Sequence, residues 1–149
     1  MWLWDILLSK IVTKIVSWNV NSIRVRLPHL SELIKSTNPD IVMLQETKST
    51  NADFPYNDIK QFGYEVLTVG QKSYNGVAIL SKIPIKIKNE SLPTNNDDPQ
   101  ARFIEVTVQS NNPFDIASVY LPNGNPIDTE KFPYKLDWMK KLKDHIKTK

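Results

Sequence analysis

The sequence predicts a mixed α/β domain in which helices flank a β-sheet. Its 149 residues are enough for one domain with a hydrophobic core of its own. Hydrophobic residues make up 40% and charged residues 23%, which is typical of a folded chain and not of a disordered one. From Lys14 onward, strand and helix patterns follow one another, first as a strand–helix–strand unit and then as a run of strands.

The first half of this pattern predicts two parallel strands joined by a helix. β-Branched and aromatic residues fill positions 14–20, as expected for a buried strand. Apolar residues then recur at helical spacing and indicate a helix that ends near Lys35; they are Leu27, Leu30, Leu33 and Ile34. Asn38-Pro39 ends this helix, and residues 41–44 form a second apolar strand. Such a unit favours parallel pairing, with the helix on one face of the sheet.

The second half predicts a meander of antiparallel strands between two helices. A short helix is expected at residues 58–62 and a longer, lysine-rich one at 129–146. Strands are expected at residues 64–69, 77–81, 83–88, 102–109 and 114–121. Residues 102–109 alternate strictly: Ile104, Val106 and Val108 lie on one face, and Phe103, Glu105, Thr107 and Gln109 lie on the other. We therefore expect one face of these strands to contact water.

The composition excludes several classes of protein. A chain without cysteine has no disulfide scaffold, zinc ribbon or cysteine nucleophile. No apolar run reaches the roughly 18 residues of a membrane span, so no membrane partner is expected. Residues 1–8 lack the early basic charge of a signal peptide, and we expect a cytoplasmic protein. The net charge of +3 suits a polyanionic partner without requiring one.

Polar side chains stand where three predicted strands end. Asn19 and Asn21 follow the first strand, Glu46 the second, and Tyr120 the last. A carboxylate beside amides and a phenol can hold Mg²⁺, which needs one or two carboxylates and otherwise accepts water and phosphate. Each residue also has a structural interpretation, as a turn asparagine, a glutamate paired with Lys48, and a tyrosine at the edge of the core.

Four segments resemble, in order and spacing, the exonuclease III type of apurinic/apyrimidinic endonucleases in the endonuclease/exonuclease/phosphatase superfamily. They are residues 18–24, 39–48, 74–81 and 119–124. The second is the most specific, because Asp40 is followed by apolar residues, Gln45-Glu46, one further residue and Lys48. The resemblance covers residues 14–146.

The resemblance implies a fold and a reaction. The family fold is a four-layer α/β sandwich, and we expect about half of it, a mixed sheet flanked by helices with the second sheet absent. The inner apolar face of that sheet would then be exposed. The implied reaction is Mg²⁺- or Mn²⁺-dependent hydrolysis of DNA phosphodiesters in base-excision repair, on duplex DNA with abasic sites or 3′ ends.

The same resemblance implies roles for individual residues. Glu46 would bind the metal with Asn19 beside it, and Tyr120 would hydrogen-bond the scissile phosphate as charge develops on it. Four residues match positions that contact the DNA backbone; they are Arg24, Arg102, Asn123 and Lys131. Solvated surface charge is the alternative interpretation of Arg24 and Lys131.

Two segments of the family pattern do not occur in the 149 residues. One is a Gly-Asp-Phe-Asn segment whose Asp helps to activate the water, and the other is a late Ser-Asp-His segment. We interpret His29 and His145, on helical stretches, as surface residues. Residues 14–149 are therefore expected to be the truncated N-terminal part of such a domain, after a non-matching extension at 1–13. We expect an incomplete and inactive form of the enzyme, monomeric unless a complementary C-terminal polypeptide binds it.

Two alternative functions follow from the same residues. The first is a phosphodiesterase of the same superfamily that acts on RNA or on a phosphoinositide or lipid. The second is a non-catalytic DNA-binding or complementation fragment, which would retain backbone contacts without the water-activating residues. Salt-dependent binding of duplex DNA without cleavage would support this second interpretation.

Overall fold

A computed structural model describes residues 12–149 and contains every strand and helix that the sequence predicts. The predicted and observed boundaries differ by two residues or fewer. The strands are β1 (Ile15–Asn19), β2 (Ile41–Gln45), β3 (Glu65–Val69), β4 (Val77–Ser81), β5 (Ile85–Asn89), β6 (Phe103–Val108) and β7 (Phe114–Val119). The helices are α2 (Ile23–Thr37), α3 (Tyr56–Lys60) and α4 (Lys131–Ile146), with a short 3₁₀ turn, η1 (Pro93–Asn95).

The first sheet has the strand order β1-β2-β4-β3 and is mixed. β1 and β2 pair in parallel, as the strand–helix–strand unit predicts, with Asn19 opposite Gln45 at their carboxyl ends. β4 is antiparallel to both β2 and β3, and all five of its residues are buried. Helices α2 and α3 cover one face of this sheet, so the prediction of a mixed sheet flanked by helices is confirmed.

The second sheet, which we expected to be absent, is present as three antiparallel strands in the order β5-β6-β7. The chain leaves the first sheet after β4 through a turn in which Ser81 Oγ accepts the backbone N–H of Ile83 at 3.1 Å. Pro84 follows and has no N–H to donate to a neighbouring strand, and the next strand, β5, pairs with β6 in the second sheet. The meander therefore folds back over the first sheet and does not widen it.

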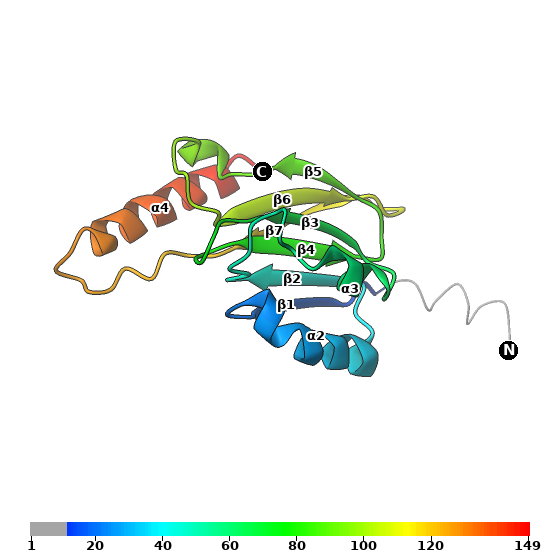
Figure 1. The fold of residues 1–149 in the computed structure, drawn as a ribbon. Helices are drawn as coiled ribbons and strands as arrows, with labels where there is room; N and C mark the ends of the chain where they lie inside the picture. Colours follow the sequence, from blue (N-terminus) through cyan, green and yellow to red (C-terminus); the bar gives the residue numbers. More distant parts are fainter. Residues whose placement is uncertain (1–11) are drawn as a thin grey trace, which may run out of the picture.

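The two sheets pack face to face and produce four layers within this chain (Figure 1). Apolar side chains of β4 meet those of β6 in the space between the sheets, where Ile79, Ile104, Val106 and Val108 are buried. Helix α4 covers the far side of the second sheet and buries Trp138 against Phe103. The expected exposure of the inner face is thus corrected, because the strands after Pro84 cover it.

Strand β6 is covered on both faces, contrary to the expectation of a face in contact with water. Phe103 and Glu105 point toward α4 and are 3% and 4% exposed. His145 of α4 lies 3.3 Å from Glu105 Oε2 and is 7% exposed, so it is a core residue and not the predicted surface residue. His29 is exposed, as predicted. Alternation in the sequence therefore identified two faces of β6 but not the helix that covers one of them.

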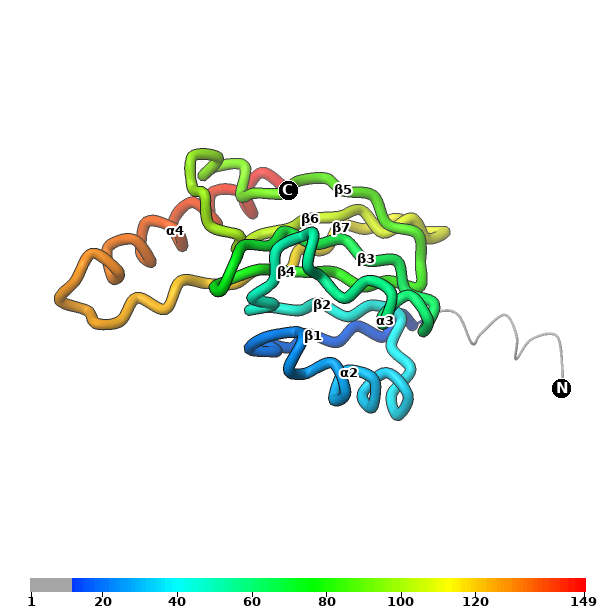
Figure 2. The backbone as a smooth tube through the Cα atoms, in the orientation of Figure 1, coloured from blue at the N-terminus to red at the C-terminus, as the bar shows by residue number. Residues whose placement is uncertain are grey.

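Strands β1 and β7 each have a neighbour on one side only within residues 12–149. β7 packs over β2 and β4 of the first sheet. The carboxyl ends of β1, β2 and β7 point to the same end of the sandwich, and the loop to α4 leaves from that end (Figure 2). In residues 12–149 no helix has the length and apolar character needed to cross a lipid bilayer.

Replacing Tyr64 with Phe is expected to make stability less sensitive to alkaline pH. The Tyr64 hydroxyl donates to the Pro39 carbonyl, and burial together with the charge of Asp40 raises the pKa of Tyr64 to about 12. The unfolded chain releases this proton near pH 10, so the hydroxyl stabilises the fold below pH 10 and this contribution is lost as pH rises toward 12. Urea unfolding should show the variant less stable by about 1 kcal/mol at pH 8 and by less at pH 11. A difference that is equal at both pH values would contradict this expectation.

Candidate active site

Backbone hydrogen bonds join five loops at the end of the sandwich where β1, β2 and β7 finish. The loop after β2 lies at the centre, because it accepts bonds from the β1–α2 loop and donates bonds to the loop before β4. The bonds are Ser22 N to Glu46 O (2.8 Å), Thr47 N to Gly76 O (3.1 Å), Gly76 N to Ala101 O (2.8 Å) and Tyr120 N to Arg102 O (2.8 Å). The loops thus form one connected surface and hold the predicted site residues on it.

Several residues of these loops have a left-handed backbone. Glu46 has a φ of 52° and Lys48 a φ of 51°, and Asn21 and Asn75 have similar values. For a residue with a Cβ this conformation is uncommon and costs energy, and it persists where surrounding bonds hold it. The interloop bonds supply this restraint at Glu46, so the direction of its side chain follows from the fold and not from local preference.

Glu46 receives polar contacts from the end of β1 and from its own loop. Asn19, the last residue of β1, donates Nδ2 to Glu46 Oε1 at 2.8 Å. The Oδ1 of Asn19 accepts the backbone N–H of Asn21 at 3.1 Å, so both ends of this amide are engaged. Lys48 Nζ lies 3.5 Å from Glu46 Oε2. The parallel pairing of β1 and β2 therefore brings together Asn19 and Glu46, two residues of the predicted site.

The protonation states of Glu46 and Tyr120 follow from their surroundings. Burial acts to raise the pKa of Glu46, but hydrogen bonds from Asn19 and Tyr120 and the charge of Lys48 outweigh it and hold the pKa below its ordinary value. Burial, and then the contact with Glu46, raise the pKa of Tyr120, and Arg102 offsets part of this rise. At neutral pH the site thus combines an ionised carboxylate with a protonated phenol.

Arg102 stands directly before β6 and lies against Tyr120. Its guanidinium carbon is 4.9 Å from the centre of the Tyr120 ring and 5.9 Å from that of Tyr134. Its Nη1 donates to the Tyr120 carbonyl at 3.3 Å, and its Nε donates to Gln100 Oε1 at 2.8 Å. Arg102 is therefore held at the same surface as Tyr120 and Glu46.

A pocket of about 540 Å³ opens beside this group of residues. Three of the four residues that the resemblance places on the DNA backbone line it; they are Arg102, Asn123 and Lys131. The remaining lining is mostly polar or aromatic and consists of Gln71, Tyr74, Asn75, Gln100, Asn125 and Tyr134 together with Pro122 and Gly124. Arg24 does not line the pocket; in the first turn of α2 it donates to the Asp53 carbonyl at 2.8 Å. The structure thus brings three of these residues together and separates the fourth, and their contact with DNA stays a prediction.

The described residues fit a metal site that uses a single carboxylate. Within residues 12–149, no group of three or more His, Asp or Glu side chains lies close enough together to hold an ion. Glu46 is ionised, and its contacts with Asn19, Lys48 and Tyr120 leave lone pairs on its two oxygens for a hard cation. Mg²⁺ accepts such a site, since water and substrate phosphate complete its coordination.

Comparison with known proteins identifies the family. The family model described as the Endonuclease/Exonuclease/phosphatase family matches residues 16–145. The chain belongs to this family. Exodeoxyribonuclease III from Haemophilus influenzae is 34% identical over 137 residues, which span 89% of this chain and 51% of that relative. This membership agrees with the order of the four segments that the sequence contains.

Solved structures of the family agree with the fold. The 3′ phosphatase NExo from Neisseria, bound to a product DNA hairpin, matches with a TM-score of 0.85 at 39% identity, over 91% of this chain and 51% of its own. An AP endonuclease from Archaeoglobus fulgidus matches with a TM-score of 0.82 at 35% identity, over 92% and 52%. The chain therefore spans about half the length of the relatives it matches.

Sequence reasoning missed several residues of this surface. Gln71, Asn75 and Gln100 form a network of amides behind Arg102, and Tyr134 provides a second aromatic ring for the guanidinium. These residues lie on two loops and on α4, so no single spacing in the sequence associates all of them. The family segments identified Tyr120 and Arg102 but not the side chains that hold them in place.

Proposed function

We propose that this chain binds DNA and contributes the phosphate-binding half of a Mg²⁺-dependent phosphodiesterase site that acts in DNA repair. The observation that supports this most is the group formed by Glu46, Asn19, Tyr120 and Arg102, which brings together an ionised carboxylate, a phenol and a cation, and of which Arg102 lines the neighbouring pocket. The names of the relatives, an exodeoxyribonuclease and AP endonucleases, support DNA as the substrate, and the proposed substrate is duplex DNA with abasic sites or 3′ ends.

Each residue of the group has a distinct role in this proposal. Glu46 would hold Mg²⁺ or Mn²⁺, and Asn19 orients the carboxylate through its 2.8 Å hydrogen bond. The metal, when bound, neutralises phosphate charge and favours attack by water. Tyr120 keeps its proton and donates to the phosphate, while Arg102 and Lys131 attract the DNA backbone from the pocket. Arg24 would contact the backbone from the start of α2.

The residues that activate water are proposed to lie outside these 149 residues. No side chain of residues 12–149 near Glu46 forms a second acidic cluster, and the Gly-Asp-Phe-Asn and Ser-Asp-His segments do not occur in the sequence. A complementary C-terminal polypeptide would supply them and would continue the sheets at edge strands, of which β1 and β7 end nearest the site and β3 and β5 are the other two. The chain alone would then bind DNA without turnover.

Binding and cleavage of a duplex that contains one abasic-site analogue test this proposal. We expect the chain to bind the duplex with an affinity that falls steeply with salt, because phosphate contacts release counterions. Cleavage in the presence of Mg²⁺ should be absent. A chain that does not bind DNA at low salt would contradict the proposed function. Robust cleavage that Glu46→Ala abolishes would contradict only the dependence on a second polypeptide.

A further inference from the structure

We propose that Gln100 is a positioning residue, which fixes the Arg102 guanidinium at the pocket wall and leaves its positive charge free for a phosphate of the substrate. This inference rests on the proposed function, because it concerns the cation beside Tyr120 in the same site. It adds a residue that neither the family segments nor the strand ends indicate.

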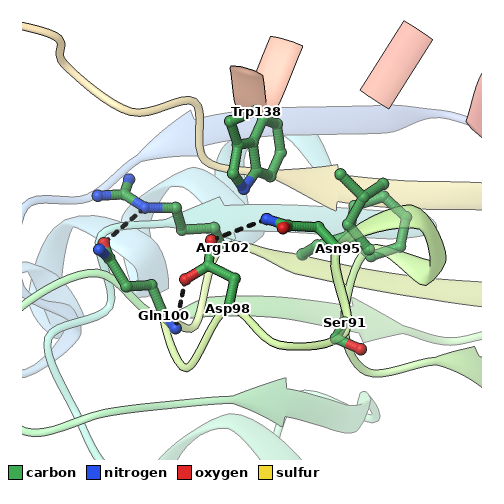
Figure 3. A pocket seen from close by; sticks show the side chains of 8 residues that line it. Ser91, Asn95, Asp98, Gln100, Arg102 and Trp138 are labelled. Carbon is green, nitrogen blue, oxygen red and sulfur yellow. Dashed lines mark hydrogen bonds between the residues drawn. The ribbon is translucent and has the colours of Figure 1, made fainter. Parts of the chain in front are cut away.

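The Gln100 side chain joins Arg102 to a network of neutral amides. Gln100 Oε1 accepts Arg102 Nε at 2.8 Å and Asn75 Nδ2 at 3.2 Å. Asn75 Nδ2 also donates to Gln71 Oε1 at 3.0 Å, and that oxygen accepts the backbone N–H of Ala101 at 2.7 Å. Gln100 is itself held, since its backbone N–H donates to Asp98 Oδ1 at 3.0 Å (Figure 3). Arg102 Nε is therefore attached to two loops that are attached to each other.

The other contacts of the Arg102 guanidinium are also with uncharged groups. They are the Tyr120 carbonyl and the rings of Tyr120 and Tyr134. Asp98 is the acidic residue nearby, but its Oδ2 accepts the Tyr134 hydroxyl at 2.7 Å and Asn95 Nδ2 at 3.1 Å. Within residues 12–149, no carboxylate lies within ion-pair distance of Arg102.

Because Gln100 is uncharged, it can orient the Arg102 guanidinium without neutralising it. A half-buried guanidinium is usually paired with a carboxylate, which fixes its direction and cancels its charge. Gln100 provides an acceptor of the same shape as glutamate and fixes the direction without cancelling the charge. The net positive charge then remains at the wall of the pocket that Arg102 shares with Lys131, where a bound phosphate can use it.

The substitution Gln100→Glu separates positioning from charge. Glutamate can accept both hydrogen bonds that Gln100 Oε1 accepts, so we expect the melting temperature to stay the same or rise. The affinity for duplex DNA should fall about tenfold, the loss expected for one charge-assisted contact. The slope of log affinity against log salt should decrease in magnitude by about one, as for the loss of one phosphate contact.

Two further variants make the comparison specific. Gln109→Glu adds the same charge to an exposed side chain at the opposite end of β6 and should bind DNA like the wild-type chain. Gln100→Ala retains the charge of Arg102 but removes its acceptor, so affinity should fall without the change in salt slope.

The chain has only three arginines, so the Nε–H signal of Arg102 can be resolved from those of Arg24 and Arg26 by NMR. This signal should exchange slowly in the wild-type and Gln100→Glu chains and rapidly in Gln100→Ala.

The outcomes distinguish this inference from the proposed function. A Gln100→Glu chain that binds DNA as tightly as wild type, or an Arg102 Nε–H that exchanges equally fast in the wild-type and Gln100→Ala chains, would overturn the inference alone. A wild-type chain that does not bind DNA would overturn the proposed function. In that case titration with inorganic phosphate still tests the role of Gln100. The inference requires phosphate to shift the Arg102 Nε–H signal of the wild-type chain but not that of Gln100→Glu. No shift in the wild-type chain would overturn it.

Discussion

Replacing Glu46 with Gln is expected to remove the affinity of the chain for Mg²⁺ while leaving the fold intact. Glutamine can still accept the Asn19 Nδ2 hydrogen bond and can adopt the same backbone, but it has no charge to offer a metal. Loss of even an outer-sphere partner weakens metal binding by roughly 10- to 100-fold, so loss of the one carboxylate that residues 12–149 bring to this site should reach at least the upper value. The contact with Lys48 is partly exposed and its loss should cost at most about 1 kcal/mol of stability.

Titration with Mn²⁺ followed by electron paramagnetic resonance measures this affinity directly, with Mg²⁺ as competitor. Glu32→Gln is the matched control. Glu32 is exposed on α2, so this substitution removes the same charge at a position away from the strand ends. It should bind Mn²⁺ like the wild-type chain. Equal affinities in the wild-type and Glu46→Gln chains would show that Glu46 is not the metal ligand.

Replacing Gly76 with Ala is expected to destabilise the chain by about 3 kcal/mol and to displace the loop that contains Glu46. Gly76 has a φ of 89°, a conformation that alanine adopts only with strain. A Cβ at this position would lie 2.1 Å from Thr47 Oγ1, and Thr47 is fully buried directly after Glu46. Because Thr47 N donates to the Gly76 carbonyl, Thr47 cannot move away without weakening the bond between the two loops.

Gly63→Ala isolates the contribution of the backbone from that of the steric overlap. Gly63 has a φ of 83°, and a Cβ there would meet no atom within 4 Å, so this variant should lose only about 1 kcal/mol. The double variant Gly76→Ala with Thr47→Ala should recover part of the loss, since it removes the hydroxyl that the new Cβ would strike. That hydroxyl has no hydrogen-bond partner within the described residues, so its removal breaks no bond. Urea unfolding of the wild-type chain, these three variants and the single variant Thr47→Ala measures the coupling, and equal losses for Gly63→Ala and Gly76→Ala would contradict the overlap.

The strands and helices could be predicted from the sequence because each has a strong local pattern. The β-branched residues of β1 and the helical spacing of Leu30 and Ile34 in α2 each indicate one kind of element. The division of the meander into two sheets could not be predicted in the same way. A hairpin that widens a sheet and a connection that starts a second layer have the same alternation, and Pro84 distinguishes them only once the neighbouring layer is known.

The residues of the site could be predicted in part, but their protonation and orientation could not. Glu46, Asn19 and Tyr120 could be proposed from strand ends and family segments, and the parallel register of β1 and β2 brings the first two into contact. The protonation and the orientation of these groups could be determined only from the structure. The pKa of Glu46 is lowered because three loops meet at it, and Arg102 is directed by Gln100 and Tyr134, whose positions depend on how β6 and α4 pack.

The sequence by itself determined the order of the elements, the family and the chemical types of the residues at the strand ends. These properties depend on local periodicity and on which side chains are present, and both can be read along the chain. Only the tertiary structure decided that this chain forms four layers and that the charge of Arg102 is unpaired within the described residues. Both depend on residues far apart in the sequence that approach only when the two sheets stack, so no local pattern contains them.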